Sequence, residues 1–142
     1  NKECIKTVKK GLTPNETEKK AIEIITQGLV DLSILNGELN ELIEKGAYRD
    51  FYMHRVGHWM GMDVHDVGSY GLNGKWRKYS PGMITTIEPG IYFKENLKNV
   101  PEEYLNIGIR IEDDVLVTGG DPEVLTSSVP KTIIEIEKVM GS

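Results

Sequence analysis

The chain has 142 residues, of which 39% are hydrophobic and 27% are charged, and its formal net charge is −5. This composition is typical of a globular protein, and its acidic balance lacks the basic surface that attracts nucleic acid or anionic membranes, so we expect neither as a partner. No apolar run reaches the length of a membrane span or a secretory signal. The single cysteine, Cys4, excludes an internal disulfide and favours a reducing cytoplasm.

The first third of the chain is predicted to be helical. Residues 1–10 have the pattern of a helix end, with Gly11 as the terminator. Residues 13–16 (Thr-Pro-Asn-Glu) form a capping box with proline at the first helical position. After the capping box, apolar residues recur every three or four positions and predict an amphipathic helix of about five turns: Ala21, Ile25, Leu29 and Leu32. A short third helix is expected over about residues 37–45.

Strand patterns follow in the middle of the chain. Aromatic and apolar residues at 51–54 predict a strand that ends at His54. Residues 69–80 are rich in Gly, Asn, Lys and Trp and are predicted to form a loop. A second strand is expected over 83–88, where a Pro-Gly pair stops it, and it resumes at 91–93.

The segment most typical of a strand is residues 107–118. Because side chains alternate along a strand, Arg110 and Glu112 share one face, opposite the isoleucines. A short strand near residues 124–125 and a capped helix over 132–140 complete the predicted elements.

All three histidines, His54, His58 and His65, lie within twelve residues of one another. Imidazole is the commonest metal ligand and the usual proton carrier near neutral pH, so this cluster predicts one site, although a turn cluster with one core histidine is the alternative. The spacing of His54 and His58 is that of zinc proteases, which place glutamate after the first histidine on a continuous helix. Arg55 occupies that position and glycines interrupt the segment, so we reject that class.

Two glutamates complete a candidate metal-binding set. Glu88 ends a strand before the Pro-Gly turn, and Glu112 lies within an apolar strand, where an unpaired carboxylate is costly to bury. Pairing of Glu112 with Arg110, and a solvent-facing turn position for Glu88, are the structural alternatives. One histidine and two glutamates from separate strands form a carboxylate-rich divalent-metal set that favours manganese, cobalt or zinc. Asp113 and Asp114 are weaker candidates.

Three segments, His54–Gly68, Thr86–Tyr92 and Gly108–Asp114, together resemble three blocks of the pita-bread metallopeptidases, and within that family the Xaa-Pro aminopeptidase (aminopeptidase P) group. The resemblance spans essentially all 142 residues. It implies an α+β fold in which helices pack on a curved, mainly antiparallel sheet, here the C-terminal half of the pita-bread fold.

The resemblance also implies roles for individual residues. His58 and Glu88 would be ligands to one ion of a dinuclear site, which Glu112 would bridge; Mn²⁺ is expected, with Co²⁺ or Zn²⁺ as alternatives. The catalytic set would be His54, His65, Glu88 and Arg110: the two histidines bind the substrate and the tetrahedral intermediate, Glu88 moves the proton, and Arg110 orients a ligand carboxylate. The implied reaction removes the residue that precedes proline at a peptide N-terminus, by attack of a metal-bridging hydroxide.

The sequence departs from the family in its upstream part. Members supply two aspartate ligands and another active-site histidine from upstream strands, and aminopeptidase P adds an N-terminal domain. Asp31 and Asp50 do not stand in the expected paired strand setting. We therefore expect residues 1–142 to be the C-terminal portion of the catalytic domain, with three of five metal ligands, weak or single metal binding and little peptidase activity by itself. The full-length protein is a possible homo-oligomer.

Three alternatives remain beside this interpretation. Prolidase shares much of residues 63–68 and cleaves only dipeptides, whereas the His58-Trp59 pair and residues 102–104 favour aminopeptidase P. Creatinase has this fold without a metal, which His58, Glu88 and Glu112 argue against. Some pita-bread domains are non-catalytic peptide- or protein-binding modules, but such members usually lose ligand residues, and here each ligand expected from this half is present.

Overall fold

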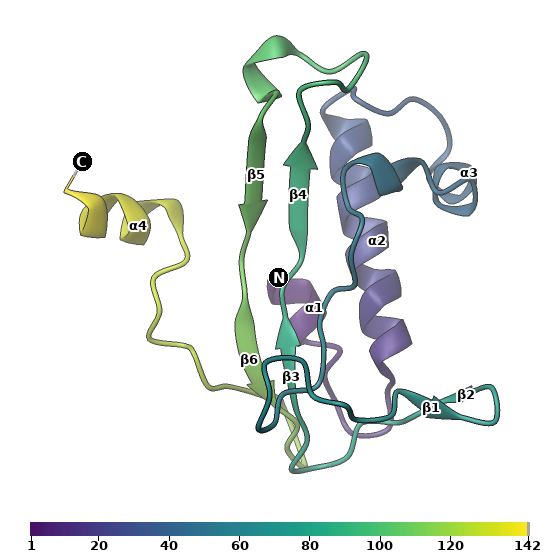
Figure 1. Ribbon diagram of the computed structural model, residues 1–142, viewed down its shortest axis with the longest axis vertical. Coiled ribbons are helices and arrows are strands. Elements are labelled where there is room, and N and C mark those ends of the chain that lie inside the picture. Colours follow the sequence, from purple (N-terminus) through teal and green to yellow (C-terminus); the bar gives the residue numbers. More distant parts are fainter. Residues whose placement is uncertain (142) are drawn as a thin grey trace.

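The computed structural model describes residues 1–141, with helices at both ends of this range and antiparallel strands between them (Figure 1). Helix α1 spans Lys2–Ile5, so the prediction of a helix to residue 10 is wrong. The Thr7 hydroxyl donates to the carbonyl of Cys4 (2.7 Å), a local bond that competes with continued helix. Helix α2 spans Pro14–Asp31, and its predicted capping box is confirmed: the Thr13 side chain accepts from the Glu16 amide and the Glu16 carboxylate from the Thr13 amide.

A second group of short helices leads to the histidine-bearing segment. Helix α3 spans Leu39–Glu44, as predicted, and Gly46 follows it in the left-handed conformation (φ 69°) that stops the helix. A 3-10 helix, η1, spans Ala47–Asp50 and carries the chain to Phe51.

The strands form one long hairpin. Strands β3 (Ile84–Ile87) and β4 (Gly90–Phe93) pair antiparallel with β6 (Asp113–Leu116) and β5 (Ile107–Arg110), respectively. The partners Ile87↔Asp113 and Gly90↔Arg110 belong to the same register, so the two ladders continue one another. A 3-10 turn, η2 (Glu102–Tyr104), lies in the connection between β4 and β5, and β7 (Glu123–Val124) pairs with β6.

The prediction of a single strand over residues 107–118 is wrong, because the ladder is interrupted on the facing strand. Pro89 has no N–H to donate, and its carbonyl oxygen receives only a long bond from the Ile111 amide (3.4 Å). The Asn1 side chain donates to the carbonyl of Ile111 (3.4 Å), the group that a residue with an N–H at position 89 would serve. Residues 111 and 112 therefore lie between two strands.

The strand predicted at residues 51–54 is also wrong, because the chain from 51 to 60 is an irregular edge of the sheet. Its carbonyl groups accept from β3 and β4 in a nearly constant antiparallel register: Phe51 from the Tyr92 amide, Val56 from Glu88 and His58 from Thr86. Of the amide groups that a regular ladder would use in return, that of Met60 donates to the Ile84 carbonyl of β3 (3.1 Å), whereas two others have side-chain partners. The Val56 amide donates to the Glu18 carboxylate (2.7 Å) and the His58 amide to the Thr86 hydroxyl (2.9 Å).

Residues 69–80, predicted as a loop, contain a small hairpin of β1 (Gly71–Leu72) and β2 (Lys75–Trp76). Its two-residue turn holds Asn73 and Gly74 at φ 52° and φ 74°, the conformation that suits a tight hairpin. The Asn-Gly pair was the sequence signal for this hairpin.

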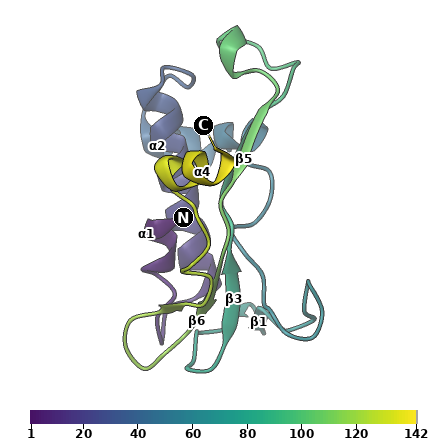
Figure 2. The same cartoon turned by 90° about the vertical axis from the view of Figure 1, so that its left-hand side faces the viewer.

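The core lies between α2 and the long hairpin, and Figure 2 shows α1 and α2 on one side of the hairpin and β1 on the other. The irregular segment contributes three buried side chains to the main cluster and Phe51 to a second one, so packing adds to its few backbone hydrogen bonds in holding it in place. The main cluster consists of Cys4, Val8, Ala21, Tyr52, Val56, Trp59, Tyr79, Ile87, Val115 and Val117.

Helix α4 (Ile133–Met140) confirms the predicted capped helix over 132–140, and its cap is a capping box of Thr132 and Glu135. No residue of α4 is buried among those described, and the helix stands away from the hairpin (Figure 1). No helix in residues 1–141 combines the length and the apolar character that a membrane crossing requires. The predicted α+β class with antiparallel strands is confirmed.

Candidate metal centre

Two carboxylates face each other where the long hairpin is interrupted. Glu88 follows β3 and Glu112 precedes β6, and the register Ile87↔Asp113 places them opposite one another. Like charges that lie directly opposite in an antiparallel pair destabilise it. Glu88 is only 8% exposed, so it is not a solvent-facing turn residue. The fold thus concentrates negative charge at one point of the sheet, where Glu88 is buried and Glu112 is exposed.

His58 joins these carboxylates from the irregular segment. Its Nε2 lies 3.1 Å from Oε1 of Glu88, and one ligand atom each from His58, Glu88 and Glu112 lies within 4.8 Å of the other two. Nδ1 of His58 lies 3.0 Å from the Trp59 carbonyl oxygen, which can only accept, so Nδ1 carries a proton. In the neutral ring, Nε2 then presents a lone pair to a carboxylate.

This arrangement fits a divalent cation. Two acceptor atoms 3.1 Å apart repel each other unless a proton or a metal ion lies between them. Metal-binding histidines usually donate their other ring N–H to a carbonyl or a carboxylate, as His58 does to Trp59. Carboxylate oxygens with one imidazole suit manganese, cobalt or zinc. The predicted His58–Glu88–Glu112 set therefore comes together as a candidate metal group.

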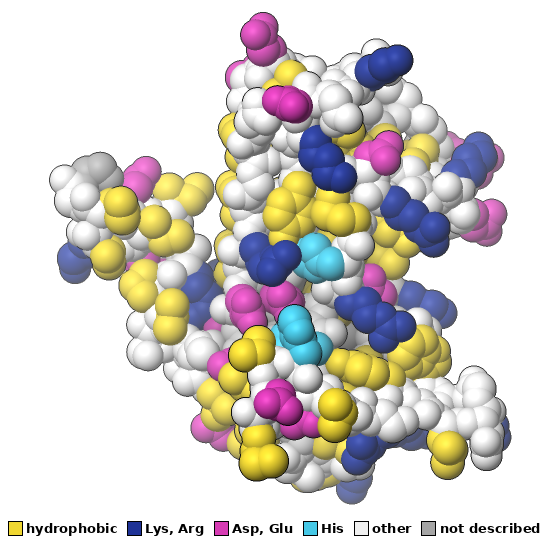
Figure 3. All heavy atoms as spheres, in the orientation of Figure 1, with side chains coloured by type: hydrophobic (Ala, Val, Ile, Leu, Met, Phe, Trp, Pro, Cys, Tyr) yellow, Lys and Arg dark blue, Asp and Glu magenta, His cyan; other side chains and the backbone are white. Residues whose placement is uncertain are grey.

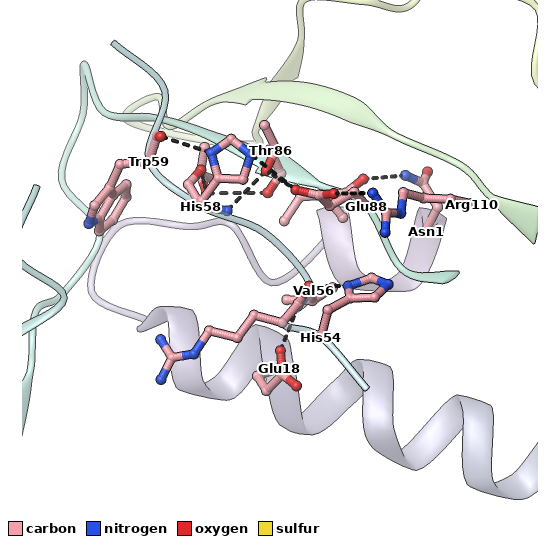
Figure 4. A network of polar contacts seen from close by, with 12 residues as sticks. Asn1, Glu18, His54, Val56, His58, Trp59, Thr86, Glu88 and Arg110 are labelled. Carbon is pink, nitrogen blue, oxygen red and sulfur yellow. Dashed lines mark hydrogen bonds and ion pairs between the residues drawn. The ribbon is translucent and has the colours of Figure 1, made fainter. Parts of the chain in front are cut away.

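Neighbouring side chains fix the direction of both oxygens of Glu88 (Figure 4). The Thr86 hydroxyl accepts from the His58 amide and donates to Oε1 of Glu88 (3.0 Å). Nη1 of Arg110 lies 3.5 Å from Oε2 of Glu88, so Arg110 forms an ion pair with Glu88 and is not a partner of Glu112 alone. The sequence analysis did not identify Thr86, although residues two apart on a strand share a face.

Tyr92 links two predicted site residues and was also missed. Its hydroxyl accepts from Nε of Arg110 (2.8 Å) and lies 2.9 Å from Nε2 of His54. Nδ1 of His54 donates to the Arg55 carbonyl (2.8 Å), which leaves Nε2 to accept the Tyr92 proton. Gly108, opposite Tyr92, makes room for the ring, since a Cβ there would lie 2.9 Å from it.

A cleft lies over these groups, and Figure 3 shows histidine and acidic side chains gathered at the middle of this face. The His65 ring packs edge to face on the His58 ring, with centroids 4.5 Å apart. Thus each predicted site residue except Glu112 lines the cleft, and Glu112 belongs to the adjoining metal group. The lining residues are His54, Arg55, Gly57, His58, His65, Tyr70, Glu88 and Arg110.

The electrostatics of the group favour a bound cation. Burial raises the pKa of the Glu112 carboxyl, and the nearby charges of Glu88 and Asp114 raise it further, whereas His58 and Arg110 lower it. Asp113, a weaker candidate, has a structural role instead. It is 2% exposed and its carboxylate contacts Lys131 (3.0 Å) and the Thr126 hydroxyl (2.7 Å), outside the candidate metal group.

The antiparallel α+β fold and its His-Glu-Glu group are those of a metallopeptidase of the pita-bread type. The chain belongs to metallopeptidase family M24, whose model matches residues 1–119. It is 50% identical over 140 residues to the Xaa-Pro aminopeptidase of Haemophilus influenzae, covering 99% of this chain and 32% of that protein.

Solved structures agree with this assignment. Pseudomonas aeruginosa aminopeptidase PepP has a TM-score of 0.92 and 48% identity, over 98% of this chain and 32% of that one. Escherichia coli aminopeptidase P, solved with the inhibitor Pro-Leu, has a TM-score of 0.92 and 44% identity, over 99% of this chain and 31% of that one. The chain therefore spans about a third of the length of the relatives it matches.

Proposed function

We propose that this chain is the C-terminal portion of the catalytic domain of a metal-dependent aminopeptidase that releases the N-terminal residue from peptides with proline in second position. The observation that carries the proposal is the convergence of His58, Glu88 and Glu112 in a chain half identical to an Xaa-Pro aminopeptidase. The chain matches only about a third of each relative's length, which supports its assignment as a portion of a catalytic domain. The exposed apolar residues of α4 form a surface that the rest of the protein would cover.

In this proposal His58, Glu88 and Glu112 would hold divalent metal, most suitably Mn²⁺, with Co²⁺ or Zn²⁺ as alternatives. When bound, such ions act as Lewis acids that polarise a carbonyl group and lower the pKa of water. Thr86 and Arg110 keep the Glu88 oxygens directed, so that one carboxylate can both hold a metal and accept or return a proton at Oε1. Cys4 is a buried free thiol, in keeping with a cytoplasmic location.

The remaining residues of the cleft serve the peptide. His54 and His65 line the cleft with His58, and their ring nitrogens can hydrogen-bond the scissile amide, at His54 by exchange of the Tyr92 hydroxyl for the substrate at Nε2. Arg110 donates to the Tyr92 hydroxyl and forms an ion pair with Glu88. It therefore connects the substrate side of the cleft with the metal side. The ring nitrogens of His54 are ordered by Tyr92 and the Arg55 carbonyl, which presets the orientation of the imidazole before the substrate arrives.

The test uses the full-length protein with Mn²⁺. His58→Ala and Glu112→Ala should each abolish cleavage of an Xaa-Pro-Xaa tripeptide and weaken Mn²⁺ binding measured by direct titration. Glu123→Ala, which removes an exposed carboxylate from β7, is the matched control and should behave as the wild type. Retained tripeptide cleavage in either ligand variant contradicts the proposal. Cleavage of Xaa-Pro dipeptides alone would indicate prolidase, and peptide binding without hydrolysis a non-catalytic module.

A further inference from the structure

The irregular segment that carries His54 and His58 depends on a residue outside the cleft. On one side it meets β3, and there the approach is very close: a Cβ at Gly57 would lie 1.9 Å from the carbonyl oxygen of Thr86. On the other side it meets Glu18, in the early turns of α2. Figure 4 shows Glu18 below Val56, on the side away from His58 and Glu88.

Glu18 binds this segment at two points. Its Oε2 accepts from the Val56 amide at 2.7 Å and from the Tyr52 hydroxyl at 3.3 Å. Both partners are buried, with 4% of Val56 and 1% of Tyr52 exposed. Burial raises the pKa of Glu18, while the Val56 and Tyr52 hydrogen bonds lower it. Because burial disfavours the charged form of this half-buried carboxylate, Glu18 stabilises the protein little as a surface charge. Its contribution lies in the groups that it orders through hydrogen bonds.

The two contacts bracket His54 and stand next to His58. The His54 ring packs edge to face against Tyr52, with centroids 5.1 Å apart, and the amide that Glu18 accepts belongs to the residue two positions before His58. The Val56 carbonyl accepts from the Glu88 amide (2.6 Å), so Val56 joins α2, through its N–H, to a candidate metal ligand, through its C=O.

We propose that Glu18 is a positioning residue, which sets the places of His54 and His58 at the metal centre by accepting the Val56 and Tyr52 hydrogens. The inference rests on the proposed function of that centre. The length of the Glu18 side chain matters in this role, because the carboxylate must span from α2 to the Val56 amide. Its charge matters less, since a neutral amide oxygen can accept the same hydrogen.

Two substitutions in the full-length protein separate length from charge. Glu18→Asp keeps the charge and is one methylene shorter, and it should weaken Mn²⁺ binding about tenfold and lower kcat more than it changes KM, as loss of a group behind a metal ligand does. Glu18→Gln keeps the length and should retain Mn²⁺ affinity to within about threefold, because its amide oxygen still accepts the Val56 hydrogen. Glu23→Asp and Glu23→Gln, at an exposed position of the same helix, are the matched controls.

Direct titration with Mn²⁺ alone gives a readout independent of activity, and thermal unfolding shows that each variant is folded. Unchanged affinity in Glu18→Asp overturns the inference, and so does a tenfold loss in Glu18→Gln, which stands as a test even where Glu18→Asp does not fold. A wild-type protein that neither binds Mn²⁺ nor cleaves Xaa-Pro peptides contradicts the proposed function instead.

Discussion

The two halves of the candidate metal centre are built in different ways. Glu88 and Glu112 occupy opposite positions in a long hairpin whose register extends over eight paired residues on each side, four in each ladder. His58 lies on a segment with a single isolated bridge, Trp59↔Thr85, held otherwise by scattered backbone hydrogen bonds, by side chains and by a glycine contact. The carboxylate half is thus set by a repeated backbone pattern, and the histidine half by a few individual contacts, so we expect the two halves to respond differently to substitution.

The largest effect is expected at Gly57, in the histidine half. Gly57→Ala places a Cβ 1.9 Å from the Thr86 carbonyl oxygen, so the segment must move away from β3 and carry His58 with it. We expect a loss of about 3 kcal/mol in the free energy of unfolding and loss of Mn²⁺ binding. Urea denaturation and metal titration measure the two. Gly119→Ala, where no atom lies within 4 Å of the added Cβ, should change neither. Wild-type metal affinity in Gly57→Ala would show that His58 is not held by this contact.

A smaller effect on stability, without an effect on the metal, is expected in the carboxylate half. Lys131→Met removes the partner of the buried Asp113, adjacent to Glu112, and should cost about 2 kcal/mol, less than a fully buried pair because the Thr126 hydroxyl still donates. Mn²⁺ affinity should be unchanged, because the ladder holds Glu112.

The matched control for Lys131→Met is Lys9→Met, which breaks an exposed pair with Asp121 and should leave the free energy of unfolding almost unchanged. Urea denaturation provides both energies. A tenfold loss of Mn²⁺ affinity in Lys131→Met would remove the distinction between the two halves, since Glu112 would then also depend on individual contacts.

The smallest effect concerns the repulsion between the two glutamates. The pKa of Glu112 is raised in the folded chain, so its contribution to stability is present at low pH and is lost as pH rises through the folded pKa. At pH 7 without metal, Glu112→Gln should therefore be more stable than the wild type by a few tenths of a kcal/mol. This difference should fade as the pH falls toward 4.5, the ordinary pKa of a glutamate carboxyl.

Adding Mn²⁺ should reverse this order, because the ion stabilises only the protein that retains its ligand. Thermal unfolding of both proteins from pH 4 to pH 7, with and without the ion, measures the effect. A wild type more stable than Glu112→Gln at pH 7 without metal would mean that Arg110 and His58 outweigh the repulsion.

Much of the fold could be predicted from local patterns. The capping boxes at Thr13 and Thr132, the glycine after α3 and the Pro-Gly break between β3 and β4 each depend on residues a few positions apart, and the structure confirms them. The failures have the opposite origin. The strand predicted over 107–118 is divided by Pro89 on the facing strand, and the segment that begins at the strand predicted over 51–54 stays irregular, with the Val56 and His58 amides donating to distant side chains.

By itself, the sequence determined which residue types could form the site: one cluster of histidines, two glutamates beside predicted strand segments and an arginine two residues before Glu112. Only the tertiary structure decided that Glu88 and Glu112 lie opposite each other, that His58 Nε2 faces a carboxylate, and that Thr86, Tyr92 and Glu18 hold them there. The physical reason is the range of the interactions. Periodicity and caps involve neighbours along the chain, whereas the hydrogen bonds that join the histidine segment to Tyr92, Glu18 and Thr86 connect residues between 28 and 38 positions apart.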